Sequence, residues 1–133
     1  MTILGQNNLS IAILGVGGIG GLLACLFWKI GFSVLCIARP NTIKDLNKSG
    51  LHLRSQVFGD FIAGPRFVSR LDFKPDILFI TTKAGDLSRA LDSIPRHLIE
   101  NSIVIPLLNG FEHIDLLRKQ FGRRVVVGMI GKT

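Results

Sequence analysis

The sequence predicts an α/β fold, in which a doubly wound, mainly parallel sheet carries helices on both faces. Short, continuously apolar runs recur along the chain, and such runs suit strands that are buried on both faces. Segments with helical apolar spacing lie between these runs, and this alternation is typical of parallel sheets. A glycine-rich turn directly after the first run is a third indication.

Each predicted strand is a short run of apolar, often β-branched residues. The runs cover residues 11–14, 33–38, 76–82, 102–108 and 124–130. Gly15 follows the first run. Arg39 and Pro40 close the second, because a proline pushes the residue before it into an extended conformation. Residues 51–63 alternate in polarity and are interrupted by glycine, so they predict a short hairpin rather than a helix.

The first two predicted helices follow the first two strands. Residues from about Gly18 to Ile30 are compatible with a helix, which the next glycine stops. Thr42 is expected to cap the second helix, whose Ile43 and Leu46 face inward and which ends at Gly50.

The two later helices have apolar residues at helical spacing. Asp86 is expected to cap the first of them, which ends at Pro95, and Gly122 ends the second. The inward-facing residues are Leu87, Ala90, Leu91 and Ile94 in one helix, and Ile114, Leu117 and Phe121 in the other.

Length and composition point to one compact domain over residues 1–133. Apolar residues make up 47% of the chain and charged residues 19%, which excludes a disordered protein. Cys25 and Cys36 both lie within apolar runs. They predict buried thiols in a reducing, cytoplasmic compartment rather than a disulfide framework.

The charge pattern argues against a nucleic-acid partner. Lysine and arginine number 16 against 9 acidic residues, for a formal charge of +7. The positive residues are dispersed, and no motif combines them with stacking aromatic residues. A solvated surface, or a small anionic ligand, is a better use of these charges.

The apolar run from Leu9 to Trp28 has about the length of a membrane span. No lysine or arginine precedes it, and its five glycines weaken a continuous helix. The α/β pattern also needs this run as its first strand and helix. We therefore expect no membrane segment.

The turn after the first strand matches the pattern G-x-G-x-x-G and consists of Gly15, Val16, Gly17, Gly18, Ile19 and Gly20. In a Rossmann-like fold, Gly15 would permit the tight turn, Gly17 would let the backbone approach a pyrophosphate, and Gly20 would let helix and strand pack closely. Free N–H groups at the start of the helix would then hold the diphosphate. The sequence predicts an NAD(P)-binding domain; the alternative is a turn that only packs the helix.

The end of the second strand favours NADP(H) over NAD(H). NAD enzymes place an acidic residue there for the ribose 2′-hydroxyl, whereas NADP enzymes often place an arginine near the 2′-phosphate. Here the strand ends at Arg39, and no acid follows until Asp45. Arg39 can make a bidentate contact with a phosphate, or it can be a solvated arginine at a strand end.

Lys83 and Asn109 follow the next two strands, where open α/β sheets bind ligands. Lys83 could meet a phosphate, a ribose or a substrate carboxylate. Asn109 could bond a nicotinamide carboxamide or a substrate oxygen. A solvated lysine and an Asn-Gly turn are the alternatives.

Four segments together resemble the ketopantoate reductases (2-dehydropantoate 2-reductases). They are ILGVGGIGG, ARPNTIKDLNKSGLHL, ITTKAGDLSRAL and VIPLLNGFEH. The resemblance implies reduction of ketopantoate to pantoate with NADPH, on the route to pantothenate and coenzyme A. It further implies that the glycine loop holds the diphosphate and Arg39 the 2′-phosphate. Lys83 and Asn109 would lie along the cofactor, and Asn109 would also bind substrate.

The resemblance has two departures. Leu108 stands where the family often has glutamine, which bears on substrate contacts rather than on cofactor binding. Family members also continue into a helical C-terminal domain that supplies a lysine general acid. We therefore expect no catalytic residue in this chain, which should bind NADPH and turn over ketopantoate poorly or not at all. Another hydroxyacid or opine-type dehydrogenase and a non-catalytic nucleotide sensor are the alternatives.

The first predicted helix is apolar on nearly every face. Its apolar residues include Leu22, Leu23, Cys25, Leu26, Phe27 and Trp28. Such a helix needs cover on more than one side, which predicts packing by a C-terminal domain or by a second copy of the chain. His52, His97 and His113 lie far apart, so no metal site is expected.

Overall fold

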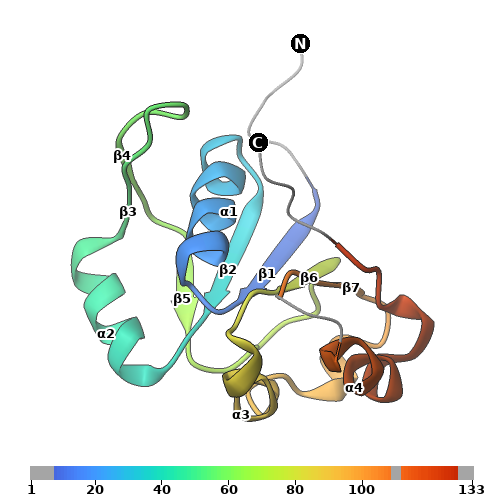
Figure 1. The fold of residues 1–133 in the computed structure, drawn as a ribbon. Helices are drawn as coiled ribbons and strands as arrows, with labels where there is room; N and C mark the ends of the chain where they lie inside the picture. Colours follow the sequence, from blue (N-terminus) through green and yellow to red (C-terminus); the bar gives the residue numbers. More distant parts are fainter. Residues whose placement is uncertain (1–7, 109–111, 129–133) are drawn as a thin grey trace.

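The computed structural model describes residues 8–108 and 112–128. Its main sheet has five strands in the order β5-β2-β1-β6-β7 (Figure 1). Their bounds are Ser10–Leu14 for β1, Ser33–Ile37 for β2, Arg66–Val68 for β5, Ile77–Ile80 for β6 and Ile103–Pro106 for β7. Every neighbouring pair is parallel. The strand order reverses between β1 and β6, as in Rossmann-like folds, so the predicted fold class is confirmed.

Helices and one hairpin connect these strands. The helices are α1 (Gly18–Lys29), α2 (Pro40–Ser49), α3 (Leu87–Leu91) and α4 (Glu112–Phe121), with 3₁₀ turns at Ala84–Asp86, Arg96–Leu98 and Gly122–Arg124. The hairpin pairs β3 (Leu51–Leu53) with β4 (Phe61–Ala63) in antiparallel register, as predicted for residues 51–63.

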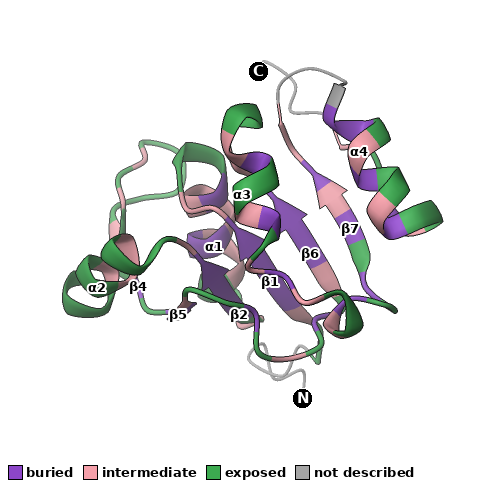
Figure 2. Ribbon diagram, turned by 90° about the horizontal axis from the view of Figure 1, so that it is seen from below, coloured by how far each residue is buried: buried purple, intermediate pink, exposed green. Residues whose placement is uncertain are grey.

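Alternate residues of the central strand face two separate apolar layers. Ile11 and Ile13 pack into a cluster with α1 and the hairpin, whereas Ala12 and Leu14 pack into a cluster with α3 and α4. Figure 2 shows α3 and α4 on one face of the buried sheet and α1 behind it. This two-sided burial is the reason that the strands are apolar without a break.

The long apolar run at the start of the chain is divided between β1 and α1. The turn between them separates a strand of 5 residues from a helix of 12. Within residues 8–108 and 112–128, no helix has the length and apolar character needed to cross a membrane. Ile19 and Trp28 on α1 are 37% and 38% exposed, and the packing of a second domain or copy on this helix stays a prediction.

The prediction that Thr42 caps α2 is wrong. The helix begins earlier, at Pro40, and Arg39 occupies the cap position with an extended backbone. Proline suits the first position of a helix, because its fixed φ matches the helix and its missing N–H would have no partner there. Ile43 and Leu46 pack inward as predicted.

The prediction that Asp86 caps α3 is also wrong. Its backbone is already helical (φ −97°, ψ −6°), whereas a capping side chain requires an extended residue, and it makes no capping hydrogen bond. The helix ends at Leu91 rather than at Pro95. Leu87, Leu91 and Ile94 are nevertheless buried in the core, as their spacing predicted.

Two further differences concern strands. The sequence reading missed β5, which is only three residues long and shows no periodicity. The strand predicted over residues 124–130 is not formed in its described part, because the last 3₁₀ turn takes up Arg124 and only Val125 bridges to Val104. Residues 129 and 130 lie outside the described residues.

Both cysteines are free and buried, as predicted. Burial raises the pKa of the Cys25 thiol, and burial together with the neighbouring Cys25 raises the pKa of Cys36 to about 12. Thiols held protonated in this way are poor nucleophiles, which fits a packing role.

Candidate nucleotide-binding site

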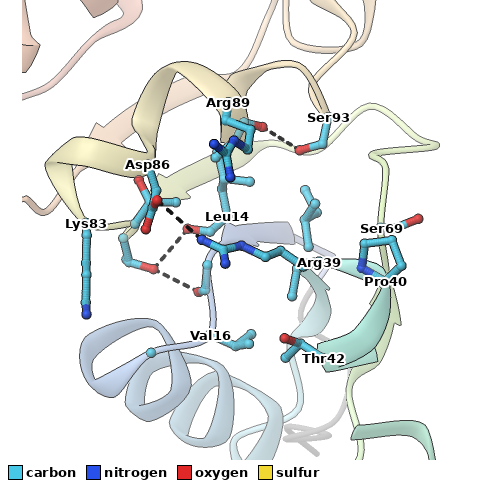
Figure 3. A pocket seen from close by; sticks show the side chains of 17 residues that line it. Leu14, Val16, Arg39, Pro40, Thr42, Ser69, Lys83, Asp86, Arg89 and Ser93 are labelled. Carbon is cyan, nitrogen blue, oxygen red and sulfur yellow. Dashed lines mark hydrogen bonds and ion pairs between the residues drawn. The ribbon is translucent and has the colours of Figure 1, made fainter. Parts of the chain in front are cut away.

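A cavity of about 610 Å³ opens at the carboxyl ends of the central strands. Its walls come from the ends of β1, β2 and β6, from the start of α2 and from α3 (Figure 3). The boundary between β1 and β6 is where the strand order reverses. Open α/β sheets bind their ligands at this position, because the connections on either side of the boundary run to opposite faces and leave a crevice.

The glycine loop forms the floor of the cavity and fits the roles predicted for its three motif glycines. Gly15 has a φ of +95°, a conformation that L side chains rarely adopt, and its N–H donates to the Ile37 carbonyl at 2.9 Å. Gly17 lines the cavity, and a Cβ added there would meet nothing within 4 Å. A Cβ on Gly20 would overlap the Gly15 carbonyl and the Thr81 hydroxyl. The loop therefore combines a tight turn, open backbone and close helix packing.

The other loop residues lie at the mouth of the cavity and at the start of α1. Val16 lines the cavity, whereas Gly18 and Ile19 are exposed in the first turn of α1. Gly17 holds the cap position and makes no side-chain capping hydrogen bond. The first N–H groups of a helix have no partner within the helix. Such groups favour an anionic ligand.

Thr81, which the sequence did not predict as a residue of the site, connects β6 to this loop through hydrogen bonds. Its hydroxyl lies 3.0 Å from the Leu14 carbonyl oxygen and 2.9 Å from the Gly15 carbonyl oxygen. One hydroxyl hydrogen shared between two carbonyls of the turn holds the loop against the neighbouring strand. A threonine at a strand end carries no sequence signal for this contact.

We expect Thr81→Val to lower the free energy of unfolding by about 1–2 kcal/mol, because it removes these hydrogen bonds and leaves a loop carbonyl without its partner. Chemical denaturation measures the change. Thr82→Val is the matched control, since the buried Thr82 hydroxyl has no hydrogen-bond partner among the described residues. Equal losses in the two variants would contradict this role for Thr81.

Arg39 reaches across the cavity to Asp86. Its Nη2 lies 3.3 Å from Oδ1 of Asp86, and the two side chains are 66% and 40% exposed. Arg39 comes from the turn between β2 and α2, where Pro40 fixes its extended backbone. Asp86 comes from the 3₁₀ turn after β6. The predicted arginine is therefore at the cavity, but it already has an acidic partner.

The charged residues that line the cavity have a net positive charge. Lys83 lines it as predicted, and Arg89 of α3 is a further cation that the sequence reading missed. Together with Arg39 they outnumber the single lining carboxylate, Asp86. A concave site with net positive charge concentrates anionic ligands.

Asn109, the predicted contact to cofactor and substrate, lies outside the described residues. Leu108, directly before it, is packed against the core. Across residues 8–108 and 112–128, no group of three or more histidine, cysteine or acidic side chains is placed to hold a metal ion.

Comparison with known proteins decides the family. The family model for the ketopantoate reductases PanE/ApbA matches residues 11–132. The chain belongs to the ketopantoate reductase family. This family consists of oxidoreductases with a nucleotide-binding dehydrogenase fold, and the chain corresponds to its N-terminal part.

Two proteins with the name of this family are similar to this chain, one in sequence and one in structure. The chain is 30% identical to the 2-dehydropantoate 2-reductase of Pyrococcus horikoshii over 88% of its own length and 38% of the relative's. It superposes with a TM-score of 0.78 on the crystal structure of the putative 2-dehydropantoate 2-reductase from Enterococcus faecalis. That pair shares 28% identity over 91% of this chain and 41% of the other.

A second kind of dehydrogenase has the same fold. A ternary structure of D-mandelate dehydrogenase with NADH and anilino(oxo)acetate matches with a TM-score of 0.80 and 26% identity, over 91% of this chain and 40% of the other. The chain thus spans about two fifths of the length of the proteins that it matches.

Proposed function

We propose that this chain is the NADP(H)-binding part of a cytoplasmic reductase that converts 2-dehydropantoate to pantoate in pantothenate and coenzyme A biosynthesis. The observation that carries the proposal is the position of Arg39 on the wall of the cavity above the glycine loop. Membership of the ketopantoate reductase family supports the choice of substrate.

The chain's own residues would divide the cofactor between them. The backbone at Gly17 and the first turn of α1 would hold the diphosphate, because Gly17 lines the cavity and no side chain caps this helix. Arg39 would bind the 2′-phosphate through a charge-assisted, bidentate contact. Lys83 would meet the cofactor beyond β6, and Asn109 would lie at the substrate edge.

The reaction also needs a proton donor. The bound nicotinamide cofactor supplies a hydride to the substrate ketone, and the resulting alkoxide must then be protonated near neutral pH. Lys83 lines the cavity beyond β6, but the family resemblance gives the general acid to a lysine of a C-terminal domain. We therefore propose that this chain supplies the cofactor half of the site.

Two measurements on the 133-residue chain test this function. We expect NADPH to bind with a change in its fluorescence, and the absorbance at 340 nm to stay constant after ketopantoate is added. A lack of NADPH binding would contradict the cofactor assignment. Steady oxidation of NADPH that depends on ketopantoate would contradict the incomplete site.

A second candidate is an NAD-dependent hydroxyacid dehydrogenase. It is favoured by the similarity to D-mandelate dehydrogenase with NADH and by the carboxylate of Asp86 beside Arg39. Equal affinity for NADH and NADPH would support this candidate. A preference for NADH or for free adenine nucleotides, without turnover, would instead indicate a nucleotide sensor.

A further inference from the structure

The Arg39–Asp86 ion pair lies where the proposed function needs a free arginine. Both side chains line the cavity, and they come from opposite sides of β1, one after β2 and the other after β6 (Figure 3). Asp86 makes no capping hydrogen bond to α3, so its carboxylate is directed to the arginine rather than to its own helix.

From this geometry we infer that Asp86 is a specificity-determining residue that weakens the preference for a cofactor with a 2′-phosphate. The inference rests on the proposed NADP(H) function. The Asp86 carboxylate lies 3.3 Å from Nη2 of Arg39, so it competes with a 2′-phosphate for the guanidinium.

The solvent exposure of the two side chains limits how strongly Asp86 affects the affinity for a 2′-phosphate. The arginine and aspartate side chains are 66% and 40% exposed, so solvent screens their attraction and the pair opens readily. Asp86 therefore lowers the affinity for a 2′-phosphate without blocking the site. A ligand with only a 2′-hydroxyl does not compete for the guanidinium, and its affinity is independent of the pair.

Asp86→Asn tests the inference, because asparagine keeps the shape and removes the charge. We expect the Kd for NADPH to fall about 3- to 10-fold and the Kd for NADH to change less than about 2-fold. Asp92→Asn is the matched control, since Asp92 is an exposed carboxylate at the end of the same helix and does not line the cavity. It should change neither Kd.

A second comparison tests whether Asp86 affects NADPH binding through Arg39. In an Arg39→Gln background, Asp86→Asn should have no larger effect on NADPH than Asp92→Asn has. A full-sized effect in that background would show that Asp86 acts directly on the ligand and would overturn the inference.

Other outcomes separate this inference from the proposed function. If the unmodified chain binds NADPH and Asp86→Asn leaves its Kd unchanged, or improves NADH equally, only the role of Asp86 fails. Weaker NADH binding in Asp86→Asn would mean that the carboxylate accepts a hydrogen bond from a ribose hydroxyl. That result would also overturn the inferred role of Asp86. If the unmodified chain binds neither cofactor, the proposed function fails and this inference fails with it.

Discussion

Replacing Gly20 with alanine is expected to destabilise the fold by more than about 2 kcal/mol and to abolish nucleotide binding. The added Cβ would overlap the Gly15 carbonyl and the Thr81 hydroxyl, and one of these is backbone. Helix α1 would have to move away from β1, which would separate the start of the helix from the glycine loop. Chemical denaturation and NADPH fluorescence measure the two losses.

Gly18→Ala is the matched control for this variant. Gly18 is exposed in the first turn of the same helix, and a Cβ there meets nothing within 4 Å. Because alanine favours helices over glycine, its stability should be unchanged or higher by up to about 1 kcal/mol. If Gly20→Ala were as stable as Gly18→Ala, the close approach of helix and loop would be wrong.

Arg39→Gln is expected to raise the Kd for NADPH about 10- to 100-fold and to change the Kd for NADH less than about 3-fold. The range follows from the loss of a charge-assisted contact worth about 1.5–3 kcal/mol. The exposed side chain of Arg39 packs little, so the fold should be unaffected. Fluorescence titrations with both cofactors measure the effect.

Arg96→Gln controls for the loss of one positive charge. Arg96 is exposed in the second 3₁₀ turn and does not line the cavity. It should reduce the affinity for either cofactor only slightly, because surface charges at a distance are screened by salt. If Arg39→Gln weakened NADPH and NADH equally, Arg39 would not bind the 2′-phosphate.

Sequence patterns predicted the central part of this fold because they reflect burial. Strands β1 and β6 are buried on both faces, so their residues are continuously apolar and stand out from the chain. The glycine loop was predictable for a related reason. A φ of +95° at Gly15 and the close packing at Gly20 both require glycine, so the geometry leaves its mark on the sequence.

Capping signals and strand propensity gave wrong predictions at Thr42, at Asp86 and after Arg124. Thr42 and Asp86 both have side chains that cap helices, but Pro40 starts α2 earlier and the helical backbone of Asp86 rules out a cap. The segment after Arg124 has strand propensity, but only one residue of its described part bridges to β7. Propensity describes what a segment prefers alone, and pairing with a neighbour overrides it.

The site itself was only half predictable. Arg39 and Lys83, which the sequence analysis singled out, both line the cavity, because strand ends of a parallel sheet meet at one edge. The partners of these residues come from other strand ends or helices. Neither the Arg39–Asp86 pair nor the hydrogen bonds of Thr81 has a sequence spacing that reveals it.

We propose above all that this chain binds a dinucleotide on its glycine loop and contacts the 2′-phosphate through Arg39. The most direct test is a pair of fluorescence titrations of the unmodified chain, one with NADPH and one with NADH. We predict saturable binding of NADPH and clearly weaker binding of NADH. Equal affinities would contradict the role of Arg39, and binding of neither cofactor would contradict the nucleotide site as a whole.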